Sequence, residues 1–299
     1  MCGYPSTEEE ILTPLETISN FNNHYDTLKL KLNDNLNLLN NSLMLVDHAS
    51  LTHNFKTAVD LAKILIDFPR RMKNSILQAA IQGKLTQQLP TDGDAKDLLN
   101  QIRAEKSKLI ADGKIKNPPQ LPPIHDEEKP FDIPDSWQWV RLGEICNYGV
   151  NENISPANME VGKLLIDLED IEKNSGRLIN KKFFDGNNAK SSKYIFRCGD
   201  VLYGKLRVYL NKVIVADDDG YCTSEILPLN FGKNIFNKYA KYFLMSPLFV
   251  DYATQVSYGT KMPRLGTKDG RLALFSLPPL AEQKRIVARL EELLPLCEI

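Results

Sequence analysis

A proline-rich stretch near the middle of the chain limits how the rest can fold. Residues 117–136 read NPPQLPPIHDEEKPFDIPDS. Proline fixes its own φ angle and lacks the backbone N–H that helices and sheets use, so this stretch is expected to be extended and to have no core of its own. We therefore predict a linker at residues 116–136, which separates a helical spacer region at 1–115 from a compact domain at 137–280.

The first part of the helical region carries the spacing of a coiled coil. Its apolar residues alternate steps of four and three and are Leu28, Leu32, Leu36, Leu39, Leu43 and Val46. Asparagines lie between them, and asparagine is a poor helix former, so this helix is expected to depend on packing. From spacing alone, a generic helical bundle is the simpler interpretation.

Two further helices are predicted before the linker. The first follows a break near residues 48–52, is kinked or interrupted at Pro69 and ends near Gly83. The second spans residues 94–111, with Asp94 as its N-cap and Gly113 just beyond its last turn. The spacer is thus expected to be a coiled-coil-like hairpin followed by a short helix.

The domain behind the linker has a mixed pattern. Short apolar or alternating segments between Gly-, Asp- and Asn-rich turns predict strands. These segments lie within residues 137–145, 161–171, 194–196, 201–206, 212–216, 225–229 and 274–277. Residues 238–245 and 247–255 have helical spacing, so the domain is predicted to be strand-rich α+β.

A helix is predicted directly behind that domain. Pro278 and Pro279 stop the last strand, and an apolar stripe begins soon after Ala281. The stripe consists of Ile286, Val287, Leu290, Leu293 and Leu294. Glu282 lies in the first turn, where a negative charge suits the helix dipole. The pattern predicts a helix over 281–299 that is still in progress at the last residue, and that needs a partner or has been cut short.

Composition narrows the classes of function. The formal net charge is −1, so a protein that binds nucleic acid would have to gather its positive charge locally. The five cysteines include no CxxC pair, which disfavours a zinc site or disulfides and favours the reducing cytoplasm. No segment resembles a membrane span, and acidic residues near the N-terminus disfavour a secretory signal.

Two motifs invite a catalytic interpretation, and both are weak. The tetrapeptide NPPQ at 117–120 resembles the Asn-Pro-Pro-aromatic motif with which amino-methylating enzymes hold a flipped base, but it lacks the aromatic ring and a glycine-rich cofactor loop. Asp269 with Glu282 and Lys284 loosely matches metal-dependent nucleases, but the last two residues open a helix. We therefore expect no catalytic residue, no metal and no cofactor.

Positive charge gathers in two parts of the domain. Lysines and arginines crowd residues 181–212, and a second group lies in the glycine-punctuated loop 257–270. Such segments can reach phosphates and base edges, although on charge alone a solvated lysine face explains them equally well. The candidate DNA-binding residues are Lys181, Lys193, Tyr203, Lys205, Arg207, Lys212, Thr260, Lys261, Arg264 and Lys268.

These candidates are assigned two roles. Lysines such as Lys181, Lys193 and Lys212 are expected to neutralise phosphates. The residues expected to reach the groove edges are Lys205, Arg207, Lys261 and Arg264, supported by Tyr203 and Thr260.

Five segments resemble, in the same order, the specificity subunit of type I restriction-modification systems. They are MKNSILQAAIQGKL (72–85), LLNQIRAEKSKLIADGKI (98–115), FDIPDSWQWVRLGEI (131–145), GDVLYGKLRVYLNKVIVADDDGYCTSEILPL (199–229) and LPPLAEQKRIVARLEELLPLCE (277–298). The resemblance runs from about residue 70 to the end, and residues 1–70 match less clearly.

The resemblance implies both an architecture and a set of partners. Members of this family carry target recognition domains joined by long antiparallel helices; each domain reads a few base pairs of a split DNA site, and the helices set the spacing. Such a subunit catalyses no reaction itself and assembles with double-stranded DNA, methyltransferase subunits and a motor nuclease subunit.

One recognition domain is present where a full subunit has two. The chain is therefore expected to be a half-size subunit that forms a homodimer through its spacer helices, or a truncated product. A coiled-coil scaffold that binds protein rather than DNA is the alternative.

Overall fold

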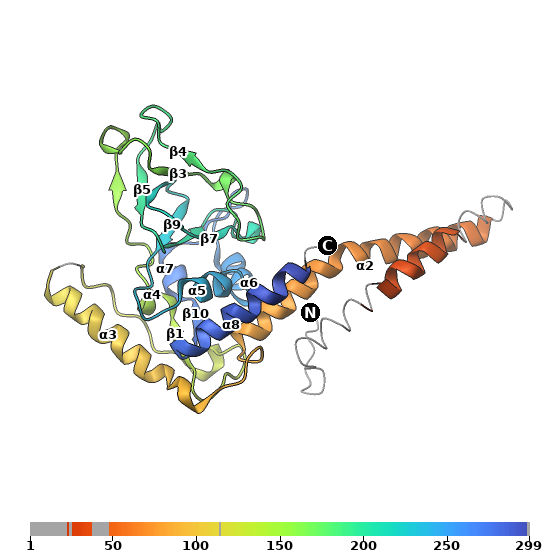
Figure 1. Ribbon diagram of the computed structural model, residues 1–299, viewed down its shortest axis with the longest axis horizontal. Helices are drawn as coiled ribbons and strands as arrows, with labels where there is room; N and C mark the ends of the chain where they lie inside the picture. Colours follow the sequence, from red (N-terminus) through yellow and green to blue (C-terminus); the bar gives the residue numbers. More distant parts are fainter. Residues whose placement is uncertain (1–22, 24–25, 38–47, 114, 298–299) are drawn as a thin grey trace. The chain divides into compact units, whose positions relative to one another are not determined.

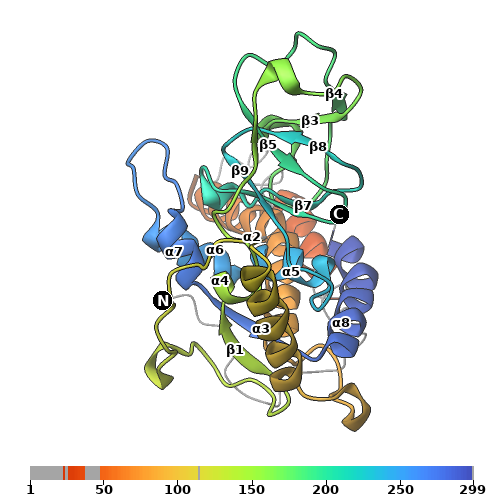
Figure 2. The ribbon, with the colours of Figure 1, turned by 90° about the vertical axis from the view of Figure 1, so that its left-hand side faces the viewer.

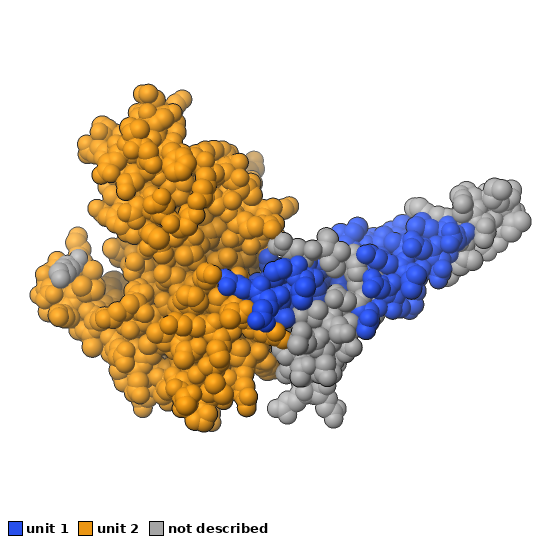
Figure 3. All heavy atoms as spheres, in the orientation of Figure 1, with its two compact units in different colours: residues 1–76, 290–299 blue, residues 77–289 orange. Residues whose placement is uncertain are grey.

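The computed structural model describes residues 23, 26–37, 48–113 and 115–297. The chain divides into two compact units, one formed by residues 1–76 with 290–299 and the other by residues 77–289 (Figure 3). The second unit contains the predicted strand-rich part and all of the candidate DNA-binding residues.

In the first unit, the described segments are helical. Residues 26–37 form one helix, in which Leu28 is buried and Leu36 is 47% exposed, while the other half of the predicted apolar seam lies outside the described residues. Helix α2 (His48–Ile81) begins here, so the break predicted near residues 48–52 was wrong: that segment contains neither Gly nor Pro to stop a helix. Helix α2 also continues through Pro69 without interruption.

The second unit starts with the last turn of α2 and a capped helix. Gly83 follows α2 with a φ of 74°, and helix α3 spans Ala95–Ala111 after the short turn η2 (Pro90–Asp92). The Asp94 side chain accepts a hydrogen bond from the Lys96 N–H at 2.6 Å, and Gly113 has a φ of 69°. Both predicted ends of α3 are therefore confirmed. Among the described residues 115–136, the linker contains the 3-10 turn η3 (Asp126–Glu128) and a hydrogen-bonded turn at Asp135 and Ser136, but no strand or longer helix.

Three sheets make up the rest of this unit (Figures 1 and 2). Strand β1 (Gln138–Arg141) pairs antiparallel with β10 (Leu274–Leu277), which joins the beginning and the end of the domain. The five-stranded sheet has the order β2 (Asn153–Ile154), β5 (Lys193–Phe196), β8 (Gly220–Cys222), β3 (Leu164–Ile166), β4 (Lys182–Phe183). The three-stranded sheet has the order β7 (Val213–Val215), β6 (Val201–Gly204), β9 (Ile226–Leu229).

Short helices complete the fold. They are α4 (Leu142–Ile145), α5 (Asn237–Leu244), α6 (Pro247–Val256), α7 (Thr267–Leu272) and α8 (Leu280–Leu293), with 3-10 turns η4 (Pro156–Asn158), η5 (Leu168–Asp170), η6 (Val208–Leu210) and η7 (Leu294–Cys297). The predicted mixture of strands and helices is confirmed. No helix in the described ranges is long and apolar enough to span a membrane.

Alternating side chains of β3 divide the core of this unit. Leu164 and Ile166 belong to one buried cluster together with residues of β5, β6 and β8, whereas Leu165 belongs to another with Phe184 and Tyr221. Successive residues of a strand point to opposite faces, so the short run LLI supports packing on both sides of the five-stranded sheet.

Several predicted boundaries need correction. The first strand stops at Arg141, and the next four residues form α4. The loop predicted at 257–270 contains the start of α7. Helix α8 ends at Leu293 rather than continuing to the last residue, because Pro295 lacks a backbone N–H and only the 3-10 turn η7 follows. Strand β8 was missed because it is short and begins with Gly220, where a Cβ would lie 2.4 Å from the Leu164 carbonyl oxygen.

Candidate nucleic-acid interface

Two segments far apart in the sequence meet at the end of β6. Arg207 N donates to the Pro263 carbonyl at 2.7 Å, and Leu265 N donates to the Lys205 carbonyl at 3.0 Å. These bonds join the segment after β6 to the loop between α6 and α7. Lys205 and Arg207 of the first predicted basic group therefore meet the second group, whereas the rest of the first group does not take part in these bonds.

The loop between α6 and α7 is a hairpin that projects from the domain (Figure 2). Tyr258 and Arg264 pair through both backbone bonds, at 3.1 and 2.9 Å. Gly259 has a φ of 97°, which a turn this tight requires and which residues with a Cβ rarely adopt. Thr260 and Lys261 lie exposed at the tip. We call this surface the basic hairpin site, and it comprises Lys205, Arg207, Thr260, Lys261 and Arg264.

The segment after β6 is held in an unusual backbone conformation. Arg207 and Asn211, on either side of η6, have φ values of 52° and 49°. The left-handed conformation costs a residue with a Cβ about 1–2 kcal/mol, and such strain persists only where surrounding bonds enforce it. The bond from Arg207 N to the Pro263 carbonyl and one from the Asn211 side chain to the Met245 carbonyl (3.0 Å) do so here.

Exposed apolar side chains lie beside these cations. Tyr258 and Met262 of the hairpin are 61% and 42% exposed, and Tyr209 of η6 is 48% exposed. Base and sugar faces of nucleic acid bind aromatic and apolar side chains next to cations. Sequence reasoning missed Tyr258 and Met262. The signal for them was their place on either side of the glycine turn.

The cations of the basic hairpin site differ in whether they form an ion pair. Within the part of the chain that the structure describes, Lys205, Arg207 and Lys261 form no ion pair. Arg264, in contrast, makes a two-pronged ion pair with Glu225, in which its Nε and Nη2 donate at 3.1 and 2.9 Å. Glu225 thus neutralises one of the predicted base-reading residues and fixes its direction.

Two candidates have buried side chains that are engaged inside the domain. Tyr203 is buried and contacts the Phe249 ring edge-to-face, with ring centroids 5.5 Å apart. Lys193 is buried as well and pairs with Asp167 at 3.4 Å. These side chains are not presented at the surface that the basic hairpin site forms.

The three remaining lysine candidates differ in whether their side chains are free to reach a ligand. Lys212 donates to the Leu168 carbonyl at 2.6 Å, and burial lowers the pKa of its ammonium group. Lys181 is exposed and pairs with Asp217 at 2.5 Å. Lys268 is exposed in the first turn of α7. Of these three, Lys181 and Lys268 remain accessible to a ligand.

The motif that loosely matched metal-dependent nucleases forms no metal site among the described residues. The Glu282 carboxylate is buried and accepts hydrogen bonds from Thr86, Gln88 and Trp137 at 3.1, 2.9 and 2.8 Å. Its role is therefore larger than the predicted dipole interaction. In the described ranges, no group of three or more His, Cys, Asp or Glu side chains could hold a metal ion.

Comparison with known proteins places the fold in a family. Residues 134–299 match the model of the type I restriction modification DNA specificity domain, and because this match covers more than half of the chain, the chain belongs to that family. It is 32% identical over 241 residues to the specificity subunit of the type I restriction enzyme EcoAI from Escherichia coli, which covers 76% of this chain and 40% of the relative.

A solved structure has a similar fold. It comes from work on the structural basis underlying complex assembly and conformational transition of the type I R-M system. The match has a TM-score of 0.50 and 28% identity, and it covers 56% of this chain and 44% of that one. The crystal structure of the HsdS subunit from Thermoanaerobacter tengcongensis matches with a TM-score of 0.49, also at 28% identity, with the same coverage of 56% and 44%. The chain spans about 40% of the length of the curated relatives EcoAI and EcoEI.

Proposed function

We propose that this chain is a DNA sequence-recognition subunit of a type I restriction-modification complex, and that it reads one half of a bipartite site. The observation that supports this most is the basic hairpin site. There, cations without ion pairs among the described residues and exposed aromatic side chains project together from a domain of the specificity family.

The assignment of residues follows their surroundings. Lys205, Arg207 and Lys261 are proposed to contact DNA directly, with Thr260 at the hairpin tip supporting them. Arg264 is proposed to read a base edge from the position that Glu225 gives it. Lys181 and Lys268 are proposed to neutralise phosphates from outside the site. Because their side chains are engaged inside the domain, Lys193, Tyr203 and Lys212 are proposed to support the surface rather than touch DNA.

The proposed organisation follows the family. Residues 137–280 are the target recognition domain, 116–136 the linker, and 1–115 and 281–299 the spacer helices. The spacer helices hold methyltransferase subunits and a motor nuclease subunit, which supply all of the catalysis in the cytoplasm. A homodimer through these helices would supply the second half-site. Two half-sites at fixed spacing multiply the modest selectivity of one, in which each base pair is worth about 1–3 kcal/mol.

Binding of duplex DNA by the purified chain tests the proposal. Fluorescence anisotropy with increasing salt should give a falling affinity, and the double variant Lys181→Gln/Lys268→Gln should flatten the slope of log K against log salt by about 2, because each cation that contacts a phosphate contributes about 0.9. Lys96→Gln, an exposed lysine on α3, is the matched control. Binding that is absent or insensitive to salt would favour the alternative, a coiled-coil scaffold that binds protein.

A further inference from the structure

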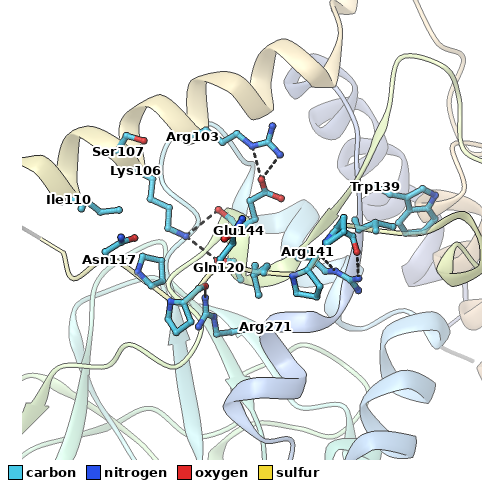
Figure 4. A pocket seen from close by; sticks show the side chains of 17 residues that line it. Arg103, Lys106, Ser107, Ile110, Asn117, Gln120, Trp139, Arg141, Glu144 and Arg271 are labelled. Carbon is cyan, nitrogen blue, oxygen red and sulfur yellow. Dashed lines mark hydrogen bonds and ion pairs between the residues drawn. The ribbon is translucent and has the colours of Figure 1, made fainter.

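A cavity of about 530 Å³ lies between α3, the proline-rich linker, α4 and α7, all of them within the second unit (Figure 4). Its volume is in the range of small-ligand sites. Four cationic side chains line it, and they are Arg103, Lys106, Arg141 and Arg271. Glu144 is the only carboxylate among the residues that line the cavity, so the lining is strongly positive.

Two of the four cations are paired. Arg103 contacts Glu144 at 2.6 Å, and Arg141 contacts both oxygens of Glu128 at 2.8 Å. Among the described residues, these are the ion pairs that the four cations form.

The other two cations have only neutral partners in the described part of the chain. The Lys106 ammonium donates to the carbonyls of Gly143 (3.0 Å) and Glu144 (3.3 Å), and Arg271 Nη2 donates to the Pro119 carbonyl at 2.9 Å (Figure 4). Burial lowers the pKa of Lys106 and the positive charge of Arg271 also lowers it, while Cys146 and the Glu144 carboxylate act in the opposite direction. The cavity therefore brings together two like charges, which a bound anion would stabilise.

The Arg271 side chain is held in position by its neighbours before any ligand binds. Its side chain lies against Gly143, where a Cβ would come within 2.8 Å of the Arg271 Cβ. A guanidinium carries five N–H donors, and the single bond to Pro119 leaves others for a ligand. A guanidinium binds tetrahedral phosphate oxygens through parallel hydrogen bonds.

The remaining walls fit an organic body next to such an anion. The prolines of the linker form a stiff apolar wall of the cavity. The side chains of Asn117 and Gln120 line the cavity together with Lys106 (Figure 4). Both amides belong to the NPPQ tetrapeptide, which the sequence singled out and the proposed function does not use. Trp139 also lines the cavity, and its buried Nε1 has no hydrogen-bond partner among the described residues.

We propose that this cavity, the α3–linker pocket, binds a phosphate group between Lys106 and Arg271. The phosphate could come from a free nucleotide or from the DNA backbone, and the second source rests on the proposed function. Both sources share the same recognition chemistry, and the experiment separates them.

Isothermal titration of the whole chain with inorganic phosphate and with AMP tests the free ligand. Arg271→Gln and Lys106→Gln should each weaken binding about tenfold, the loss expected when one charge-assisted contact of roughly 1.4 kcal/mol is removed. Lys108→Gln, on the same helix but outside the cavity, and Lys261→Gln, in the basic hairpin site, should bind as the unaltered chain does. Thermal unfolding of each variant confirms that it is folded.

A parallel titration with duplex DNA tests the other source. If a backbone phosphate occupies the pocket, each pocket variant should flatten the salt dependence of DNA binding by about 1. The proposal is overturned if the pocket variants bind phosphate, AMP and DNA as the unaltered chain does. It is also overturned if succinate binds as tightly as AMP, because the site would then recognise charge without phosphate. Loss of DNA binding by Lys261→Gln alone concerns only the proposed function.

Discussion

The indole Nε1 of Trp137 donates to the carboxylate of Glu282 at 2.8 Å, although 145 residues separate them. The same buried carboxylate accepts bonds from Gln88 and Thr86. One side chain therefore joins the segment after α2, the start of β1 and the first turn of α8. Within the second unit, this network fixes the first turn of α8 to the segment after α2 and to the residue that precedes β1.

Removing that carboxylate should destabilise the protein strongly. Glu282→Ala removes the acceptor of the Trp137 indole and the Thr86 hydroxyl, whereas Gln88 keeps its bonds to the carbonyls of Gly83 and Thr86. Losing bonds to a buried charged group costs about 3 kcal/mol or more. Glu282→Gln keeps one acceptor oxygen and should cost less. Urea unfolding measures both, with the exposed Lys284→Ala on the same helix expected to stay within about 0.5 kcal/mol of the unaltered chain. A Glu282→Ala variant as stable as that control would refute the role of the network.

Local features of the fold could be predicted from sequence because local chemistry determines them. Asp94 and Gly113 end α3 through interactions with neighbouring residues. The role of Glu282 could not be predicted, because its partners lie 145 to 196 residues away. Sequence placed Glu282 correctly in a first helical turn and could assign it only a dipole.

In the basic hairpin site, too, the local features could be predicted from the sequence and the contacts between distant segments could not. Both basic segments were visible in the sequence, but their meeting depends on the backbone bonds that link Arg207 to Pro263 and Lys205 to Leu265. Which lysines stay accessible depends equally on tertiary partners. Burial of Lys193 against Asp167 has no signature in the residues around it.

Tyr203 should matter for stability and not for DNA recognition. It packs edge-to-face on Phe249 in the core, so Tyr203→Ala should cost about 3–5 kcal/mol, as truncation of a buried aromatic does. Tyr203→Phe keeps the ring and should leave DNA affinity and discrimination unchanged at every position. A selective loss at particular base pairs for Tyr203→Phe would show that the hydroxyl reaches DNA after all.

The ion pair between Arg285 and Asp92 predicts a dependence of stability on pH. The hydrogen bond from Arg285 holds the pKa of Asp92 below its ordinary value. A carboxyl whose pKa is lowered on folding contributes stability above its unfolded pKa of about 3.9 and loses it as the pH falls through the folded value.

Asp92→Asn should therefore lower stability at neutral pH by about 1–2 kcal/mol. The gap between variant and unaltered chain should close progressively below about pH 3.9. Chemical unfolding at a series of pH values measures it, with the exposed Asp97→Asn on α3 as the control. A gap that stays constant down to the lowest pH would contradict the assignment.

Substitutions of Lys181 and Arg264 should change DNA binding in different ways. Lys181 is exposed at the edge of the five-stranded sheet, so Lys181→Ala should lower affinity about equally for all sequences and flatten the salt slope by about 1. Arg264→Ala should weaken discrimination at particular base pairs by about 1–3 kcal/mol. Binding arrays of duplexes measure both, and equal losses on all sequences for both variants would contradict the division of roles.

Glu225 provides the sharpest test of the basic hairpin site. Its carboxylate neutralises Arg264 and repels phosphates nearby, so Glu225→Gln should raise the affinity for non-specific DNA and steepen the salt slope by about 1. Discrimination should fall, because Arg264 then loses the partner that fixes its direction. The double variant Glu225→Gln/Arg264→Ala should discriminate no worse than Arg264→Ala alone, since the carboxylate acts through the arginine. Additive losses in the double variant would show that Glu225 contacts DNA independently of Arg264.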